Sequence, residues 1–315
     1  MNLLVTGGAG FIGSHFVLRH IAQRPDDTVV VLDKLTYAAD KEFLDPVNER
    51  IRFYKGDIID VQVVSEIIRR YDIDAIVNFA AETHVDRSIA DPIPFLHTNI
   101  LGMQSLIEVC KLFPKTLLLH ISTDEVYGDL EDGERARKPD DPLTPSSPYA
   151  ASKAAGDLLL LAAVRTYGIR ARITRCTNNY GPHQASEKFI PTVIRNALAG
   201  KPVPIYATGK NKRDWLFVYD HCDAIEFLLT RDDIDGRVFH VSADAERENM
   251  DVAKTLLRLL GKPETLLQSV PDRPGHDWRY ALDSSELRGL GWKPAVTFEE
   301  GLKKTVDWYV ERAGR

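Results

Sequence analysis

The first 23 residues carry the feature that most constrains the fold, because an apolar run, a glycine-rich turn and a helical pattern follow one another directly. Residues 2–6 are predicted to form a short buried strand, and a helix is predicted to end near Gln23. Gly7, Gly10 and Gly13 lie between them. Glycines at such a turn permit a tight bend and close approach of a pyrophosphate, and the helix N-terminus offers free N–H groups. This pattern favours a dinucleotide site over a glycine-rich turn without a ligand.

Apolar runs of strand length alternate with helical patterns from residue 2 to residue 174, which is typical of a doubly wound parallel α/β sheet of the Rossmann type. Further strands are predicted at residues 29–32, 51–55, 74–79, 116–121, 169–174 and 238–241, and helices at 61–70, 93–112 and 146–167. The pattern changes after Arg175. We therefore expect a dinucleotide-binding domain over residues 1–175, to which the chain returns around 215–243. Residues 176–315 should form mainly a smaller mixed α/β lid that binds substrate.

Composition excludes several classes of protein. The net charge is −6 with no basic block, so no nucleic-acid partner is expected. No apolar run reaches the roughly 18 residues of a membrane span, and no signal peptide is visible. Cys110, Cys176 and Cys222 lack the spacing of metal ligands, so we expect no metal and three buried free thiols. These features predict a cytoplasmic protein.

The acid that ends the second strand indicates which dinucleotide would bind. Asp33 stands at the distance from the glycines where a carboxylate takes the ribose hydroxyls of NAD and repels the 2′-phosphate of NADP. Lys34 weakens this preference, and a plain turn acid is the alternative reading of Asp33. Asp57 could accept from the adenine amino group, because Asp60 is the better cap for the helix at 61–70. The small side chains of Ala80 and Ala81, after the fourth strand, allow a ligand close to the backbone.

Residues 122–128 contain two adjacent acids where a buried strand ends. In an open α/β sheet that edge is where ligands bind, so Asp124 and Glu125 need a chemical explanation. Tyr149 and Lys153 are four residues apart, which places both on one face of a helix. A strand-end hydroxyl from Thr123, two acids and this pair form a larger acid/base set than simple hydride transfer requires. His84 has no evident partner nearby and is interpreted as structural.

Two features remain open on the residues alone. Lys188, Arg213 and Arg273 come from scattered segments, and they could bind a diphosphate if they converge or remain solvated surface cations. The helices at 93–112 and 146–167 are more apolar than one buried face needs. This favours a helix–helix interface between subunits, with burial inside one subunit as the alternative.

Several stretches together resemble the extended short-chain dehydrogenase/reductases: residues 6–14, 122–128, 149–153 and 213–215. With residues 81–88, 178–182 and 273–277 included, the chain is most similar within that superfamily to the dTDP-glucose 4,6-dehydratases. The similarity runs from residue 2 to about residue 310. The tyrosine–lysine pair is shared by the whole superfamily, whereas the Thr-Asp-Glu triplet occurs in far fewer of its members.

The resemblance implies a tightly held NAD, a homodimer and a reaction on a dTDP-sugar. C4 of dTDP-glucose would be oxidised, water eliminated across C5–C6, and hydride returned to C6. Thr123 and Tyr149 would hold the C4 hydroxyl, with Asp124 as acid and Glu125 as base in the dehydration. NAD contacts would also come from Phe11, Ile12, Ile58 and Thr98. Substrate contacts would come from Thr83, Asn178, Lys188, Tyr206, Arg213, Asn249, Arg273 and His276.

Other readings stay open beside this one. A UDP-glucose 4,6-dehydratase would share the triplet. A 4-epimerase or UDP-glucuronate decarboxylase of the same superfamily usually lacks an acid at position 124. A non-catalytic NAD-binding sensor would belong to a different class, but it would have no need of Thr123, Tyr149 and Lys153.

Overall fold

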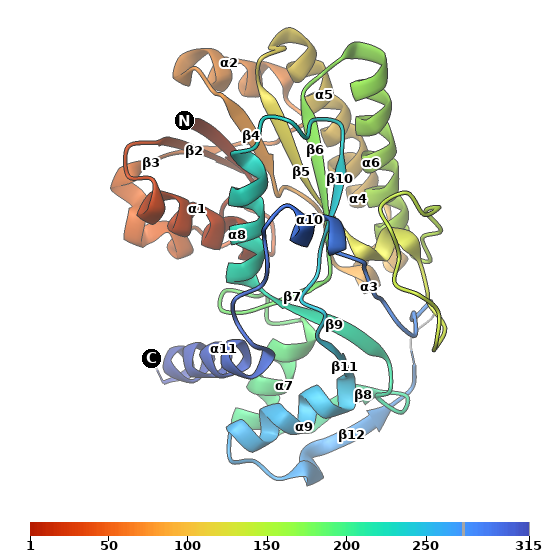
Figure 1. Cartoon of the computed structure of the whole chain (residues 1–315). Coiled ribbons are helices and arrows are strands. Elements are labelled where there is room, and N and C mark those ends of the chain that lie inside the picture. Colours follow the sequence, from red (N-terminus) through yellow and green to blue (C-terminus); the bar gives the residue numbers. More distant parts are fainter. Residues whose placement is uncertain (273–274, 315) are drawn as a thin grey trace.

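A seven-stranded parallel sheet organises the chain (Figure 1). The structure, a computed structural model, describes residues 1–272 and 275–314, so the predicted substrate contact Arg273 lies outside the described residues. The strand order is β10-β6-β5-β4-β1-β2-β3. The strands are β1 (Asn2–Thr6), β2 (Thr28–Asp33), β3 (Ile51–Lys55), β4 (Ala75–Asn78), β5 (Leu117–Thr123), β6 (Ala171–Cys176) and β10 (Val238–Val241). The doubly wound Rossmann topology is confirmed.

The order of the strands creates a crevice between β1 and β4. The chain runs outward from β1 to β3 and then returns to place β4 on the other side of β1, where Val5 pairs with both Val31 and Val77. Loops that follow the two halves therefore leave the sheet in opposite directions, which opens a ligand site at the carboxyl ends of the strands.

Helices cover both faces of this sheet (Figure 1). On one face, α1 (Phe11–Gln23) packs beside α8 (Val218–Leu229), with Phe16 and Ile225 in the same apolar cluster. On the other face lie α2 (Val61–Tyr71), α5 (Gly102–Leu112) and α6 (Pro148–Tyr167), which contribute Val64, Leu106 and Leu160 to a second cluster. Asp60 caps α2, as predicted, by accepting from the N–H groups of Gln62 at 3.0 Å and Val63 at 3.1 Å.

The predicted helix at residues 93–112 is not one regular α-helix. It consists of α4 (Ile93–Phe95), a π-helical segment η2 (Leu96–Leu101) and α5. The side chain of Asn99 ties this segment to the chain after β4, because it accepts from Glu82 N–H and donates to the Glu82 carbonyl, both at 3.0 Å. Gly156 of α6 allows the close packing, since a Cβ there would lie 2.7 Å from the Asn99 carbonyl oxygen. Such π segments are frequent at functional sites.

Three strands, β2, β5 and β6, extend further than predicted at their carboxyl ends. β5 continues through Ser122 and Thr123 because parallel pairing with β6 persists there, with Ser122 opposite Arg175 and Thr123 opposite Cys176. The polar residues end the apolar run in the sequence, but the backbone hydrogen bonds between β5 and β6 continue past them. The catalytic candidates therefore begin inside the sheet instead of in a loop.

The part of the chain after β6 builds a smaller unit below the sheet and sends β10 back to pair with β6 (Figure 1). One small sheet has the order β11-β9-β7, and β12 pairs with β8. The strands are β7 (Asn178–Tyr180), β8 (Val203–Tyr206), β9 (Lys212–Phe217), β11 (Glu246–Glu248) and β12 (Leu267–Val270). Helices α7 (Phe189–Leu198), α9 (Asn249–Leu259) and α11 (Phe298–Ala313) complete it around a third apolar cluster containing Tyr180 and Phe217.

Short elements make up the remaining helical structure. They are η1 (Lys41–Arg50), α3 (Val85–Ala90), η3 (Asp124–Tyr127), η4 (Glu264–Leu266) and α10 (Ser285–Gly289). The three cysteines are buried free thiols. Within residues 1–272 and 275–314, no helix has the length and apolar character needed to cross a membrane, and no group of three potential metal ligands occurs.

Candidate active site and cofactor cavity

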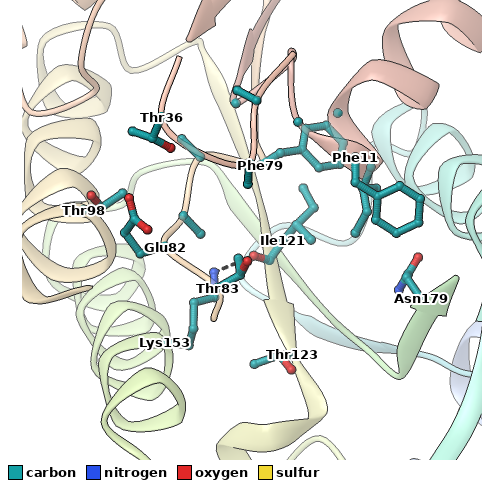
Figure 2. A pocket seen from close by; sticks show the side chains of 18 of the residues that line it. Phe11, Thr36, Phe79, Glu82, Thr83, Thr98, Ile121, Thr123, Lys153 and Asn179 are labelled. Atoms are coloured by element: carbon teal, nitrogen blue, oxygen red, sulfur yellow. Dashed lines mark hydrogen bonds between the residues drawn. The ribbon is translucent and has the colours of Figure 1, made fainter. Parts of the chain in front are cut away.

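A cavity opens at the carboxyl edge of the sheet, and every residue predicted to bind the cofactor lines it (Figure 2). These residues are Gly7, Gly10, Phe11, Ile12, Gly13, Asp33, Lys34, Asp57, Ile58, Ala80, Ala81, Thr98, Tyr149 and Lys153. The catalytic candidates Thr123, Asp124 and Glu125 line the same cavity. One site therefore contains both sets.

The glycines at positions 7 and 13 lie where a side chain would collide with neighbouring backbone. Gly7 has φ +68°, and a Cβ there would come within 2.6 Å of Ala80 N. A Cβ on Gly13 would lie 2.3 Å from the Gly7 carbonyl oxygen. Gly10 is the N-cap of α1 and supplies no side-chain hydrogen bond, so the first N–H groups of this helix are left for another acceptor. These residues fit a pyrophosphate.

Asp33 is held at the end of β2 by two backbone donors. Its carboxylate accepts from Ala9 N–H at 2.9 Å and from Leu35 N–H at 2.7 Å. Burial raises the pKa of Asp33, and these two hydrogen bonds oppose that rise. Lys34 forms an ion pair with Asp57 at 2.7 Å, which reduces its availability to a 2′-phosphate. The geometry fits a dinucleotide with free ribose hydroxyls.

Thr123 organises the two acids. Its hydroxyl donates to Asp124 Oδ1 at 3.1 Å and accepts from Glu125 N–H at 3.3 Å, so it caps the η3 turn that carries both carboxyls. Asp124 is only 3% exposed, and among the described residues its Oδ2 has no hydrogen-bond partner. Burial and the neighbouring Glu125 raise the pKa of Asp124 well above its ordinary value, against the hydrogen bond from Thr123. This environment favours the protonated acid.

Tyr149 and Lys153 project from the first turns of α6, whose N-terminus is set by Ser147 accepting from Ala150 N–H at 3.1 Å. Burial and Glu125 raise the pKa of Tyr149 well above its ordinary value, whereas a hydrogen bond with Thr123 opposes that rise. Lys153 donates to the Ile121 carbonyl oxygen at 2.7 Å (Figure 2). Burial lowers the pKa of Lys153 to about 8. The surrounding acids thus favour a neutral phenol, and positive charge in the cavity would favour the phenolate.

The predicted substrate residues fall into two groups. Thr83, Asn178 and Lys188 line the cavity, and Lys188 Nζ donates to the Thr83 carbonyl oxygen at 3.0 Å. Tyr206, Arg213, Asn249 and His276 do not line it.

Two of the residues outside the cavity lining have strong local contacts. Arg213 is 5% exposed and donates to the carbonyl oxygens of Asp277 at 2.8 Å and Trp278 at 3.1 Å. His276 lies 2.6 Å from Asp272, and its ring is 5.7 Å from that of Tyr206. Convergence of the scattered cations on one diphosphate stays a prediction.

His84 has a structural contact, in line with its interpretation. Its side chain accepts from Arg87 N–H at 3.3 Å and so caps α3.

Four residues near the site were not predicted from the sequence. Asn99 holds the Glu82 backbone, and His120, Asp157 and Arg175 lie behind Lys153. The spacing of Asp157, four residues after Lys153, was the one available signal for this buried group.

Comparison with known proteins places the chain in a family. The family model described as GDP-mannose 4,6 dehydratase matches residues 4–305. A dTDP-glucose 4,6-dehydratase of Mycobacterium tuberculosis is 50% identical over 312 residues, covering 98% of this chain and 93% of that protein. The crystal structure of DesIV, a dTDP-glucose 4,6-dehydratase from Streptomyces venezuelae with NAD bound, has a TM-score of 0.95 at 46% identity and covers 100% of this chain and 98% of that one.

A related enzyme with different chemistry has the same fold. A UDP-glucose 4-epimerase from Thermus thermophilus in complex with NAD has a TM-score of 0.90 at 32% identity, covering 98% of this chain and 99% of that one. The chain therefore belongs to the GDP-mannose 4,6-dehydratase family of the extended short-chain dehydrogenase/reductases, and its relatives from Mycobacterium tuberculosis and Streptomyces venezuelae, at 50% and 46% identity, are dTDP-glucose 4,6-dehydratases.

Proposed function

We propose that this protein is an NAD-dependent nucleotide-sugar 4,6-dehydratase that converts dTDP-glucose to dTDP-4-keto-6-deoxyglucose. One observation carries the proposal: a buried Asp124 stands beside Glu125 in the cavity that also contains Tyr149 and Lys153. A 4-epimerase needs the tyrosine and lysine to oxidise C4, but it has no use for a buried acid at position 124.

The first step is removal of the C4 hydroxyl proton by Tyr149. NAD, when bound, accepts a hydride from C4 and later returns one to C6, so no net oxidation occurs. Thr123, which contacts both the acids and the tyrosine, orients the C4 hydroxyl. Lys153, held at the Ile121 carbonyl oxygen, places positive charge that favours the phenolate.

The paired acids then divide the elimination. The C4 ketone acidifies the C5 hydrogen, which Glu125 removes as the base, and a proton is added back to C5 when hydride is returned to C6. Asp124 protonates the departing C6 hydroxyl, and a carboxyl that keeps its proton is suited to this role. Different surroundings support different roles: Asp124 is almost fully buried, whereas Glu125 is partly exposed.

The rest of the substrate would lie between the sheet and the smaller unit. We propose the domain division at residues 1–175 and 176–315, with the return near 215–243. Thr83, Asn178 and Lys188 would contact the sugar and the diphosphate from the cavity wall. Arg213, Asn249, Tyr206 and His276, together with Arg273, would complete the site from the lid.

The decisive experiment is an assay of the product. Incubation with dTDP-glucose should yield the 4-keto-6-deoxy sugar, and comparison of kcat/KM with UDP-glucose tests which base is preferred. A C4-inverted sugar formed without loss of water would favour an epimerase. Absence of turnover on any nucleotide sugar, with NAD and sugar bound, would favour a sensor.

We further propose a homodimer through the helices at 93–112 and 146–167 in the cytoplasm. Large apolar side chains are exposed on these helices, with Ile93 at 55%, Leu101 at 46% and Leu158 at 56%. Pairing of the two helices between subunits would cover them. A monomer in light scattering at micromolar concentration would refute the dimer.

The proposed cytoplasmic location rests on the cysteines, because three buried free thiols suit a reducing compartment.

A further inference from the structure

A buried polar cluster lies behind Lys153 and has no role in the chemistry described above. His120 of β5, Asp157 of α6 and Arg175 of β6 have exposures of 3%, 0% and 2%. None of the three lines the cavity. Burying charged groups carries a large desolvation cost. Their position next to the active-site lysine gives a reason for burying these groups despite that cost.

The contacts of Lys153 direct its ammonium group. Its Nζ donates to the Ile121 carbonyl oxygen at 2.7 Å, which Figure 2 shows, and lies 3.3 Å from His120 Nε2. An ammonium group has three N–H bonds. Two of them point to these protein acceptors, which leaves the third for the cavity that Lys153 lines.

This arrangement specifies the tautomer of His120. If Nε2 accepts from Lys153, Nδ1 carries the ring proton and must donate to the side chain of Asn78, 3.0 Å away. The amide of Asn78 must then turn its oxygen to His120 and its nitrogen to Thr6, which reverses the placed orientation, in which Thr6 Oγ1 donates to Asn78 Oδ1 at 2.6 Å and Asn78 Nδ2 faces His120 Nδ1. Burial lowers the pKa of His120 well below its ordinary value, so the ring stays neutral and can accept.

Asp157 is the carboxylate of this cluster. It stands one helical turn after Lys153, and its Oδ2 accepts from Arg175 Nε at 2.9 Å. Its Oδ1 lies 3.6 Å from His120 Nε2 and has no hydrogen-bond partner among the described residues. Arg175 is also bound to the Tyr127 hydroxyl and, at 3.1 Å, to the Pro139 carbonyl oxygen.

The other groups that face Lys153 do not replace Asp157. Burial raises the pKa of the Cys176 thiol to about 12, so that group is neutral. Tyr149, Asp124 and Glu125 share the cavity with Lys153, and burial raises the pKa of the first two well above their ordinary values. Glu125, partly exposed, remains the one other acid near the lysine.

We propose that Asp157 and His120 are positioning residues for Lys153, with Asp157 keeping the lysine charged and His120 fixing the direction of its ammonium group. The proposal rests on the proposed function, in which Lys153 supports Tyr149 as the base. Without Asp157, Lys153 and Arg175 would be two buried cations without a shared anion. The lysine, unlike the arginine, can relieve this by losing its proton.

The test measures the titration of Lys153 directly. In the protein with NAD bound, ¹⁵N NMR of lysine side chains follows each Nζ with pH, and Lys153→Met identifies the signal. Asp157→Asn should lower the titration midpoint by about one pH unit or more, because Lys153 Nζ and Asp157 Oδ1 lie 3.3 Å and 3.6 Å from the same atom, His120 Nε2, and a nearby opposite charge shifts a pKa by roughly 1–3 units. The high-pH decline in the rate of C4 oxidation, followed as reduced nicotinamide in a single turnover, should move down by the same amount.

A matched control separates this effect from loss of stability. Arg172, also on β6, has a fully buried side chain and pairs with Asp235 at 2.8 Å. Asp235→Asn removes the carboxylate charge that pairs with this buried guanidinium, but it should not change the titration midpoint of Lys153. A shift in Asp235→Asn as large as that in Asp157→Asn would refute the proposal.

A second variant keeps the test decisive if Asp157→Asn does not fold. His120→Leu removes the neutral acceptor, and it too should lower the Lys153 midpoint. An unchanged midpoint in His120→Leu, or in a folded Asp157→Asn, would overturn the proposal. Failure of the proposed function would look different, since the wild type would then form no product from dTDP-glucose while the NMR titration still reported the lysine.

Discussion

The seven-stranded sheet and the smaller C-terminal unit bury their strands differently. Every residue of β5 is buried, and so are the last five residues of β2. In β8 of the smaller unit buried and exposed residues alternate, and the three residues of β11 are all partly buried. Strands covered by helices on both faces are buried along their length and mostly apolar, whereas strands with one solvated face alternate.

The same contrast applies to the functional residues. Thr123, Asp124 and Tyr149 are placed by the end of β5 and the start of α6, so the backbone of two adjacent elements determines their positions. Arg213 is placed by side-chain hydrogen bonds to the carbonyl oxygens of a distant segment. We propose that the sheet supplies the chemistry and the smaller unit supplies recognition, and the predictions below test that division.

The largest effect should come from Tyr149→Phe. The phenolic oxygen is the proposed base for C4 oxidation, so its loss should prevent reduced nicotinamide from appearing and lower turnover by about 10⁴. NAD should still bind, because the glycine turn and Asp33 are untouched. Single-turnover absorbance and a cofactor titration measure the two quantities. Normal accumulation of reduced nicotinamide would contradict the assignment.

The second-largest effect should come from replacing either of the two acids. Asp124→Asn and Glu125→Gln keep the shape of each side chain but remove its ionisable proton, which should cost roughly 10²–10⁴ in turnover. Both variants should still oxidise C4 and then accumulate reduced nicotinamide. Glu125→Gln should also slow exchange of the C5 hydrogen with solvent, whereas Asp124→Asn should leave that exchange largely intact. If Asp124→Asn turned over at the wild-type rate, the proposed mechanism would be wrong.

A change on the recognition side should separate binding from chemistry. Lys188→Met removes a cation that lines the cavity and donates to the Thr83 carbonyl oxygen. Hydrogen bonds to charged groups contribute about 1.5–3 kcal/mol, so KM for the nucleotide sugar should rise roughly 10- to 100-fold. The single-turnover rate at saturating sugar should change far less. A fall in that rate with unchanged KM would place Lys188 in the chemistry instead.

The smallest effect should come from the ring stack that joins the two regions. His183, in the turn after β7, stacks on His15 of α1 at 4.2 Å and on Phe43 of η1 at 4.1 Å, with Trp308 of α11 beside it. His183→Ala should lower stability by about 1 kcal/mol beyond its loss of buried area. Thermal unfolding measures this, and KM for the sugar should rise more than that for NAD.

A control within the sheet region sharpens this last test. Tyr71→Phe removes the hydrogen bond between the hydroxyls of Tyr71 and Tyr54, which are 2.9 Å apart and take no part in the ring stack. It should leave KM for the sugar unchanged. An equal rise in KM for both variants would mean that the stack has no special part in joining the regions.

The parallel sheet and its glycine turn were predictable because their patterns are local. A strand buried on both faces is a largely apolar run, as residues 2–6 are, and the two edge strands at 51–55 and 238–241 were also predicted with the bounds that the structure has, although residues 52–55 are at least partly exposed. The tyrosine–lysine pair was equally readable, since residues four apart on a helix share a face. The sequence also determined that two acids follow β5, and with that the class of chemistry.

The tertiary structure decided what depends on contacts between distant segments. Parallel pairing with β6 carried β5 on through Ser122 and Thr123, and the helix predicted at 93–112 contains a π segment whose Asn99 side chain binds the Glu82 backbone. Burial gave Asp124 and Glu125 different surroundings, although they are adjacent and chemically alike. The placement of Asp157 against Arg175, and of His120 against Lys153, joins β5, α6 and β6. No local pattern encodes such a meeting, because desolvation and hydrogen bonding act only once the chain has packed.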